Sequence, residues 1–176
     1  MDSRTKQYID SLTIDQIPWG RMYTAYAVAS NFGTLLHTLT ETEDPAVFRE
    51  TFRALSDMEH QSTLTPPAPF VTVFLVRILD RERQRGGRSE IAETILHVLS
   101  YYLEICNEYA AYSDAEPLPH FADILDEQYL LPENCTDDDL EEIFEDPDSL
   151  PETLFASFYY YTKQVLLLIP ELQEQA

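Results

Sequence analysis

Glycine, cysteine and long apolar runs are all scarce in this chain of 176 residues. The four glycines, at positions 20, 33, 86 and 87, are too dispersed for a glycine-rich phosphate-binding loop. The two cysteines, Cys106 and Cys135, are too few for a disulfide framework, so we expect two reduced thiols. The longest apolar run near the C-terminus, 165–169, is far shorter than the roughly 20 residues of a membrane-spanning helix. With the polar N-terminal segment, these features predict a cytoplasmic protein.

Basic residues are also few, and they are unevenly placed. The chain has 11 Lys and Arg against 32 Asp and Glu, a net charge of −21. Residues 1–88 hold ten basic and eleven acidic side chains, whereas residues 89–176 hold one basic residue, Lys163, and 21 acidic ones. Nucleic acid and anionic membranes are disfavoured as partners, because Lys and Arg supply phosphate contacts. We expect a basic protein partner, and a monomer or a weak dimer formed through the near-neutral half.

The apolar pattern predicts an all-α fold of antiparallel helix pairs, either a short HEAT-like solenoid or a helical bundle, in a single domain over 1–176. Three- and four-residue apolar steps predict helices over 22–40, 45–58, 65–82 and 90–112, a short one near 118–130, one starting at Asp137, and a last one over 151–168. Asp44 before Pro45, and Ser89, are expected N-caps. No window alternates as a β-strand does. Trp19, the single tryptophan, is expected to be buried.

Five arginines crowd the junction between the two halves: Arg77, Arg81, Arg83, Arg85 and Arg88. They could suggest a nucleic-acid surface. Because so many carboxylates follow in the chain, we expect them instead to pair with acidic groups of the second half.

A series of short motifs lies between residues 17 and 79. In chain order they are Ile17-Pro18-Trp19, Thr24-Ala25-Tyr26, Leu35-Leu36, Glu59-His60-Gln61-Ser62-Thr63, Ala68-Pro69-Phe70 and Phe74-Leu75. The series resembles bacterial HEAT-like proteins, whose leading repeats read roughly tryptophan, Ala-Tyr-Gly, His-Gln-Gly-Thr and Ala-Pro-x-x-x-x-Phe-Leu. The resemblance implies an α-solenoid-like interaction protein of the small toxin-immunity kind, without catalytic residues. Two family glycines are replaced here, by Ala27 and by Ser62.

Catalytic and metal-binding patterns are missing from the sequence. The histidines, at positions 37, 60, 97 and 120, lack a second His or a Cys at the spacing of a helical zinc site. Asp137, Asp139 and Glu141 match the first ligand positions of a calcium loop, but Glu142 stands where glycine is required and Asp148 where a glutamate is required. We therefore expect no metal, no cofactor and no enzymatic activity.

The acidic stretch 133–152 is the strongest candidate for a binding surface, since it holds ten carboxylates and no basic residue. Leu140, Ile143 and Phe144 within it can anchor a helix to the protein body. Three consecutive tyrosines nearby cannot all face one core, because successive helical residues are about 100° apart. The expected partner-binding residues are Asp137, Asp138, Asp139, Glu141, Glu142, Glu145, Asp146, Asp148, Tyr159, Tyr160 and Tyr161.

Two functions fit such a surface. The first is an immunity-type protein that binds and neutralises a basic toxin or effector, such as a nuclease, by charge and aromatic contacts. The alternative is an acidic secretion chaperone or adaptor that holds an apolar segment of an effector. A solvated face that only keeps the protein soluble is the plainest explanation of the charge run.

Overall fold

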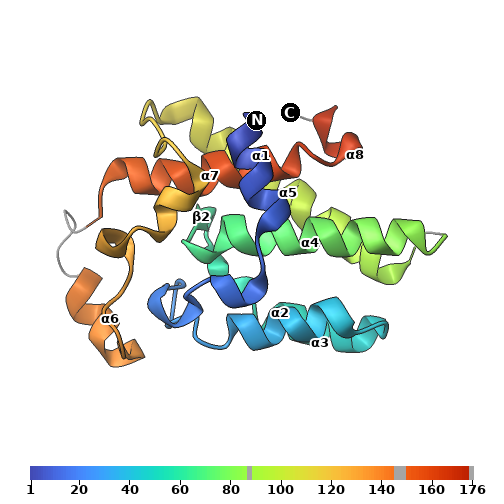
Figure 1. Cartoon of the computed structure of the whole chain (residues 1–176), viewed down its shortest axis with the longest axis horizontal. Coiled ribbons are helices and arrows are strands. Elements are labelled where there is room, and N and C mark those ends of the chain that lie inside the picture. Colours follow the sequence, from blue (N-terminus) through green and yellow to red (C-terminus); the bar gives the residue numbers. More distant parts are fainter. Residues whose placement is uncertain (87–88, 145–149, 175–176) are drawn as a thin grey trace.

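The computed structural model describes residues 1–86, 89–144 and 150–174, with 141–144 as backbone alone. Its α-helices are α1 (Ser3–Ser11), α2 (Phe32–Glu41), α3 (Pro45–Arg53), α4 (Pro67–Gln84), α5 (Glu90–Tyr112), α6 (Asp137–Phe144), α7 (Glu152–Leu166) and α8 (Pro170–Gln173) (Figure 1). Short 3-10 turns lie at Ile14–Gln16, Trp19–Arg21, Ser56–Met58, Phe121–Leu125 and Glu127–Tyr129. The expected all-α fold class is confirmed.

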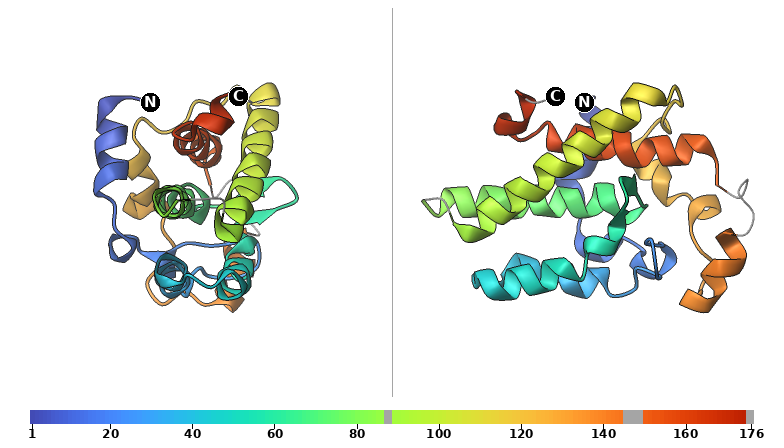
Figure 2. Two further views of the ribbon diagram at one scale, coloured as in Figure 1. Left: turned by 90° about the vertical axis from the view of Figure 1, so that its right-hand side faces the viewer. Right: turned by 180° about the vertical axis from the view of Figure 1, so that it is seen from behind.

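Two antiparallel helix pairs stack on each other and are closed by α7. The α2–α3 pair lies on the α4–α5 pair, with α2 against α4 and α3 against α5, and α7 packs across α4 and α5. Seen end-on, α4 is central, with the other long helices around it (Figure 2). From Pro67 to Leu79 all but one of its side chains are buried, as a helix surrounded on every side requires. The main core runs from Ile9 to Leu172 and so draws on both halves of the chain.

Capping explains where several helices begin. The Asp44 carboxylate accepts the backbone N–H of Ala46 (2.8 Å), and Pro45 occupies the first turn of α3. The Ser89 hydroxyl accepts the N–H of Ala92 (3.1 Å) at the start of α5. Both expected N-caps are confirmed, because each side chain satisfies a backbone donor that has no partner within the helix.

Two of the junction arginines, Arg77 and Arg81, serve as helix C-caps. Arg77 donates to the carbonyls of Ile9 (2.5 Å) and Leu12 (2.7 Å), where α1 ends. Arg81 donates in the same way to carbonyls at the end of α2, those of Thr40 and Thr42. A guanidinium suits this task because its several N–H groups reach more than one unpaired carbonyl.

Pairing with the acidic half holds for one of these arginines in the described part of the chain. Arg83 forms an ion pair with Glu171 (2.7 Å). Arg85 pairs instead with Glu43 (2.6 Å), in the first half. Arg88 lies outside the described residues. The expectation that the cluster as a whole neutralises the second half was therefore wrong, since most of its members bind carbonyls and carboxylates of their own half.

The predicted helix over 22–40 begins ten residues late, at Phe32. Residues 22–31 form a turn closed by an antiparallel bridge between Tyr23 and Val28. The buried Thr24 hydroxyl accepts the N–H groups of Tyr26 (3.3 Å) and Ala27 (3.1 Å), which a helix would have used. Such local bonds compete with helix formation. The helical spacing of apolar residues before Phe32 was thus coincidental, and Tyr26 is 61% exposed rather than buried.

The prediction of no strand was wrong at one place. Strands β1 (Glu59–His60) and β2 (Thr63–Leu64), of two residues each, pair as a β-hairpin. Both turn residues, Gln61 (φ 49°) and Ser62 (φ 63°), are left-handed, as the tight hairpin turns that match strand twist require. His60 is consequently in a strand and not at a helix end, so it does not cap helix carbonyls. The predicted helix near 118–130 is likewise replaced by two 3-10 turns.

Replacing Ser62 by glycine should stabilise the protein. A left-handed non-glycine residue costs about 1–2 kcal/mol, and the greater freedom of glycine in the unfolded chain offsets part of it, so we expect Ser62→Gly to gain about 0.5–1 kcal/mol. Ser62→Ala keeps the Cβ atom and should gain nothing. Urea denaturation measures both, and equal stabilities for the two variants would contradict the strain argument.

Trp19 is buried, as expected, and its indole is held both by a hydrogen bond from its N–H group and by packing of its ring. Its indole N–H donates to the Ile14 carbonyl (2.9 Å), and its ring lies against Phe32 (6.0 Å between centroids). Gly33 lies directly over the ring: a Cβ built there would be 3.0 Å from Trp19 Cδ1. Gly20, by contrast, has open space around it.

Gly33→Ala should therefore displace the tryptophan. We expect a loss of about 1–2 kcal/mol of stability from overpacking and a change in indole fluorescence. Gly20→Ala is the matched control and should leave both unchanged or gain up to about 1 kcal/mol. Because the protein has one tryptophan, emission spectra and urea denaturation report directly on this contact. Equal behaviour of the two variants would show that the ring is free to move.

Candidate partner-binding surface

The acidic helix α6 is attached to the protein by a second, small hydrophobic core. Leu140 packs there with Leu131 and with two residues of the turn before α2, Tyr23 and Val28. This core is separate from the main one and lies at one end of the molecule (Figure 1). Anchoring by Leu140 agrees with expectation, whereas the side chains of Ile143 and Phe144 lie outside the described part.

Arg21 fixes the segment that leads into α6. Its guanidinium makes two bonds to the Glu127 carboxylate (2.5 and 2.9 Å) and a third to the Leu131 carbonyl (2.7 Å). The Leu131 N–H in turn donates to the Arg21 carbonyl (2.9 Å). The hydrogen bond to Arg21 lowers the pKa of Glu127, and the same bond raises the pKa of Arg21. A forked, charge-assisted contact of this kind sets position and direction together.

The three consecutive aspartates of α6 have different roles. Asp137 accepts the backbone N–H of Val28 (2.7 Å) and so joins the helix to the turn before α2. Asp139 accepts both the backbone N–H (2.8 Å) and the hydroxyl (2.7 Å) of Thr136, and these bonds lower its pKa. Asp138 is exposed and makes no side-chain hydrogen bond within the described residues. Replacing Asp137 or Asp139 would therefore loosen α6, so these two predicted partner-binding residues also have a structural role.

The remaining acidic candidates are placed only in part. Glu141 and Glu142 belong to α6, whose side chains past residue 140 are not described. Glu145, Asp146 and Asp148 lie outside the described residues. None of the ion pairs formed by described residues uses an aspartate of α6, so its charge is not neutralised within that part of the chain.

The tyrosine triplet divides as helical geometry requires, with one residue outside. Tyr160 is 44% exposed, whereas Tyr159 (6%) and Tyr161 (2%) belong to the core. The Tyr161 hydroxyl donates to the Leu118 carbonyl (2.7 Å), and the Tyr159 hydroxyl bonds the β-hairpin at Leu64 N–H (3.2 Å). The prediction that Tyr159 and Tyr161 contact a partner directly was therefore wrong, because both side chains are buried. They are buried because they connect α7 to segments far away in the chain.

A group of exposed aromatic and acidic residues was missed by the sequence reasoning. The Tyr26 hydroxyl bonds His60 Nδ1 (2.7 Å), and the rings meet edge to face. Beside them the Tyr101 hydroxyl donates to Glu59 (3.3 Å). The signal lay within the quoted Thr24-Ala25-Tyr26 and Glu59-His60-Gln61 motifs, which the fold brings together. Their meeting depends on the turn before α2 and on the hairpin, neither of which the apolar pattern revealed.

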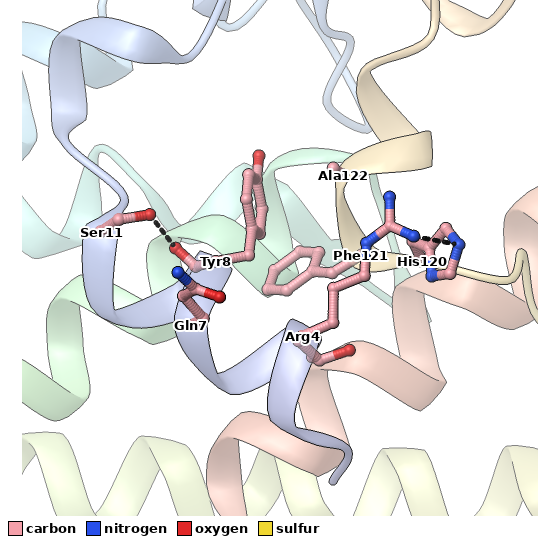
Figure 3. Close-up of a pocket in the computed structure, with 8 residues that line it drawn as sticks. Arg4, Gln7, Tyr8, Ser11, His120, Phe121 and Ala122 are labelled. Carbon is pink, nitrogen blue, oxygen red and sulfur yellow. Dashed lines mark hydrogen bonds between the residues drawn. The ribbon is translucent and has the colours of Figure 1, made fainter.

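A cavity of about 270 Å³ lies between α1 and the 120–122 segment (Figure 3). Arg4 donates to Nε2 of His120 (2.9 Å), so that nitrogen is an acceptor and not a proton donor. The Ser11 hydroxyl donates to the Tyr8 carbonyl (3.0 Å), at the opposite side of the cavity from His120. A serine–histidine pair is therefore not formed, and the cavity does not hold the groups of nucleophilic catalysis.

The two cysteines are free thiols in different surroundings. Burial raises the pKa of Cys106 to about 12. Burial also raises the pKa of the half-buried Cys135, with a further contribution from the charges of Asp139 and Asp137. Among the described residues, no group of three or more His, Cys, Asp or Glu side chains is arranged to hold a metal ion.

Thiol alkylation should therefore follow burial and local charge. We expect iodoacetamide at pH 8 to modify Cys135 slowly and Cys106 only after unfolding, because the thiolate is the reacting form. Added salt should accelerate modification of Cys135, since it screens the neighbouring carboxylates. Mass spectrometry distinguishes the sites, and Cys135→Ser provides the single-thiol control. Faster modification of Cys106 than of Cys135 would contradict this order.

Comparison with protein-family models, curated proteins and solved structures found no match. Within the described part, no helix combines the length and apolar character needed to cross a membrane. The feature that the surface offers is an acidic helix held in place by the small core and by the bond between Asp137 and Val28.

Proposed function

We propose that this protein is an immunity-type inhibitor, which binds a basic bacterial toxin or effector in the cytoplasm and neutralises it. The observation that carries the proposal is the attachment of α6. Leu140 in the small core, the Asp137–Val28 bond and the Arg21 contacts hold an acidic helix in a defined place. A carboxylate run that served solubility alone would need no such attachment. Ordered charge of one sign steers a partner of the opposite sign and fixes its orientation.

The architecture supports the same proposal. Stacked antiparallel helix pairs are the arrangement of α-solenoids, which use extended surfaces for binding. The resemblance of 17–79 to HEAT-like immunity proteins agrees with that arrangement, and the motif residues Tyr26 and His60 are in contact.

The secretion chaperone or adaptor remains the alternative, and the surface composition weighs against it. An apolar segment needs an apolar groove. Most of the large exposed hydrophobic side chains among described residues are tyrosines, namely Tyr26, Tyr101, Tyr112 and Tyr160. Tyrosine beside carboxylate is typical of a polar protein interface.

The decisive experiment compares two charge-matched variants. The first, Asp138→Asn/Glu141→Gln/Glu142→Gln, removes three of the five carboxylates of α6 and keeps Asp137 and Asp139, which hold the helix in place. The control, Glu41→Gln/Glu50→Gln/Glu174→Gln, removes the same charge from α2, α3 and the residue after α8. A basic partner captured from the native host is identified by mass spectrometry, and its association rate and inhibition are then measured with each variant.

We expect the α6 variant to associate about tenfold more slowly, with a weaker dependence on salt, while the control behaves as wild type. Both variants should fold normally, as circular dichroism will show. Equal association rates for the two variants would refute α6 as the binding surface. Binding that is insensitive to salt would instead support the chaperone alternative.

A further inference from the structure

A cavity of about 410 Å³ opens between the C-terminal end of α5 and the N-terminal end of α7. Two aromatic rings, two carboxylates and a short loop line it: Tyr109, Tyr112, Ser113, Asp114, Ala115 and Glu152. In Figure 1 these helix ends lie on the left-hand side of the molecule, in its upper part, whereas α6 lies on the same side in the lower part. The cavity is thus separate from α6 both in sequence and in position.

The aromatic side of the cavity, formed by Tyr109 and Tyr112, is held in place by contact with the core. The Tyr109 ring stacks on the buried Tyr159 ring, with centroids 3.8 Å apart and planes 4° apart. Tyr112 meets Tyr109 edge to face at 5.7 Å and is itself 73% exposed. An exposed tyrosine supported in this way presents ring surface at little conformational cost, as aromatic residues in binding sites do.

The charge of the lining is of one sign. Asp114 and Glu152 contribute carboxylates, and no Lys or Arg lines this cavity. Lys163, the one basic residue of the second half, lines a smaller neighbouring cavity that shares Tyr109, Ser113 and Ala115. Ring faces together with carboxylates attract cations, because the ring quadrupole and the charge act in the same direction.

We propose that this cavity receives an arginine side chain of the basic partner. A guanidinium stacks on an aromatic face and bonds a carboxylate with two parallel N–H groups, whereas a lysine ammonium is a hydrated point charge that does neither as well. Tyr112 is assigned the stacking surface, and Asp114 and Glu152 the charge. The identity of the partner as a basic protein rests on the proposed function, but the chemistry of the cavity is tested without it.

The test uses small probes and amide NMR of the isotope-labelled full chain. N-acetyl-arginine methylamide should bind with a dissociation constant on the order of 1–10 mM and shift the signals of Tyr112, Ser113 and Ala115. The citrulline analogue, which is nearly the same in shape but uncharged, should bind at least tenfold more weakly. The lysine analogue should also be weaker. Equal shifts with the citrulline analogue, or tighter binding of the lysine analogue, would overturn the proposal.

Matched variants locate the binding. Tyr112→Ala and Glu152→Gln should each weaken arginine binding at least threefold, whereas Tyr112→Phe should retain it because the ring remains. Tyr101→Ala and Glu104→Gln, which change the same residue types on α5 outside the cavity, should have no effect. Binding that survives both Tyr112→Ala and Glu152→Gln would place the probe elsewhere and refute the assignment.

The two proposals fail in different ways. If the arginine probe does not bind but the α6 variant still slows partner association, the cavity assignment alone is wrong. If the probe binds as expected but the α6 variant associates with the partner at the normal rate, the cavity assignment stands and the proposed role of the acidic helix is wrong.

Discussion

The burial of α4 is the constraint on which the rest of the structure depends. From Pro67 to Leu79 its side chains are enclosed, with one exception, by helices on every side. That exception is Arg77, whose guanidinium reaches out to the end of α1. Because a helix with no exposed face must be covered all round, the positions of α2, α5 and α7 are set by their contacts with it. Removal of any one of these helices would expose apolar surface along α4.

Polar contacts then pair the backbone groups that apolar packing leaves without hydrogen-bond partners. Helix ends carry unpaired carbonyls, and in this molecule Arg77 and Arg81 satisfy those of α1 and α2 from the surface of α4. Other basic residues of the first half join the two halves of the chain, as Arg21 does with Glu127, Arg49 with Glu90 and Arg83 with Glu171. The carboxylates of the second half have few such partners, which leaves the surface strongly acidic without any long-range arrangement being needed.

The proposed binding surface depends on a different principle, the attachment of a charged element by a small apolar contact. Leu140 provides burial, Asp137 a bond to the backbone of Val28, and Arg21 a fixed entry into the segment. Repulsion among neighbouring carboxylates opposes the ordering of α6, and these contacts offset it. Elsewhere on the surface, the stack of Tyr109 on Tyr159 joins α5 to α7 and leaves Tyr112 exposed.

The sequence by itself determined the helical class, the start of α3, the bounds of α4, α5 and α7 to within two residues, the caps at Asp44 and Ser89, and the exposure of one tyrosine in three. These follow from local rules: apolar spacing, capping chemistry and the 100° turn of a helix. The predicted end of α3 was five residues too late. Only the tertiary structure decided the turn before α2, the hairpin at Gln61–Ser62 and the division of roles among the aspartates of α6. Each depends on a partner distant in the chain, such as Val28 for Asp137, Tyr159 for the hairpin, and Leu131 for Arg21. The spacing of apolar residues does not predict such pairings. It shows which face of a helix or strand is apolar, but not which segment packs against that face.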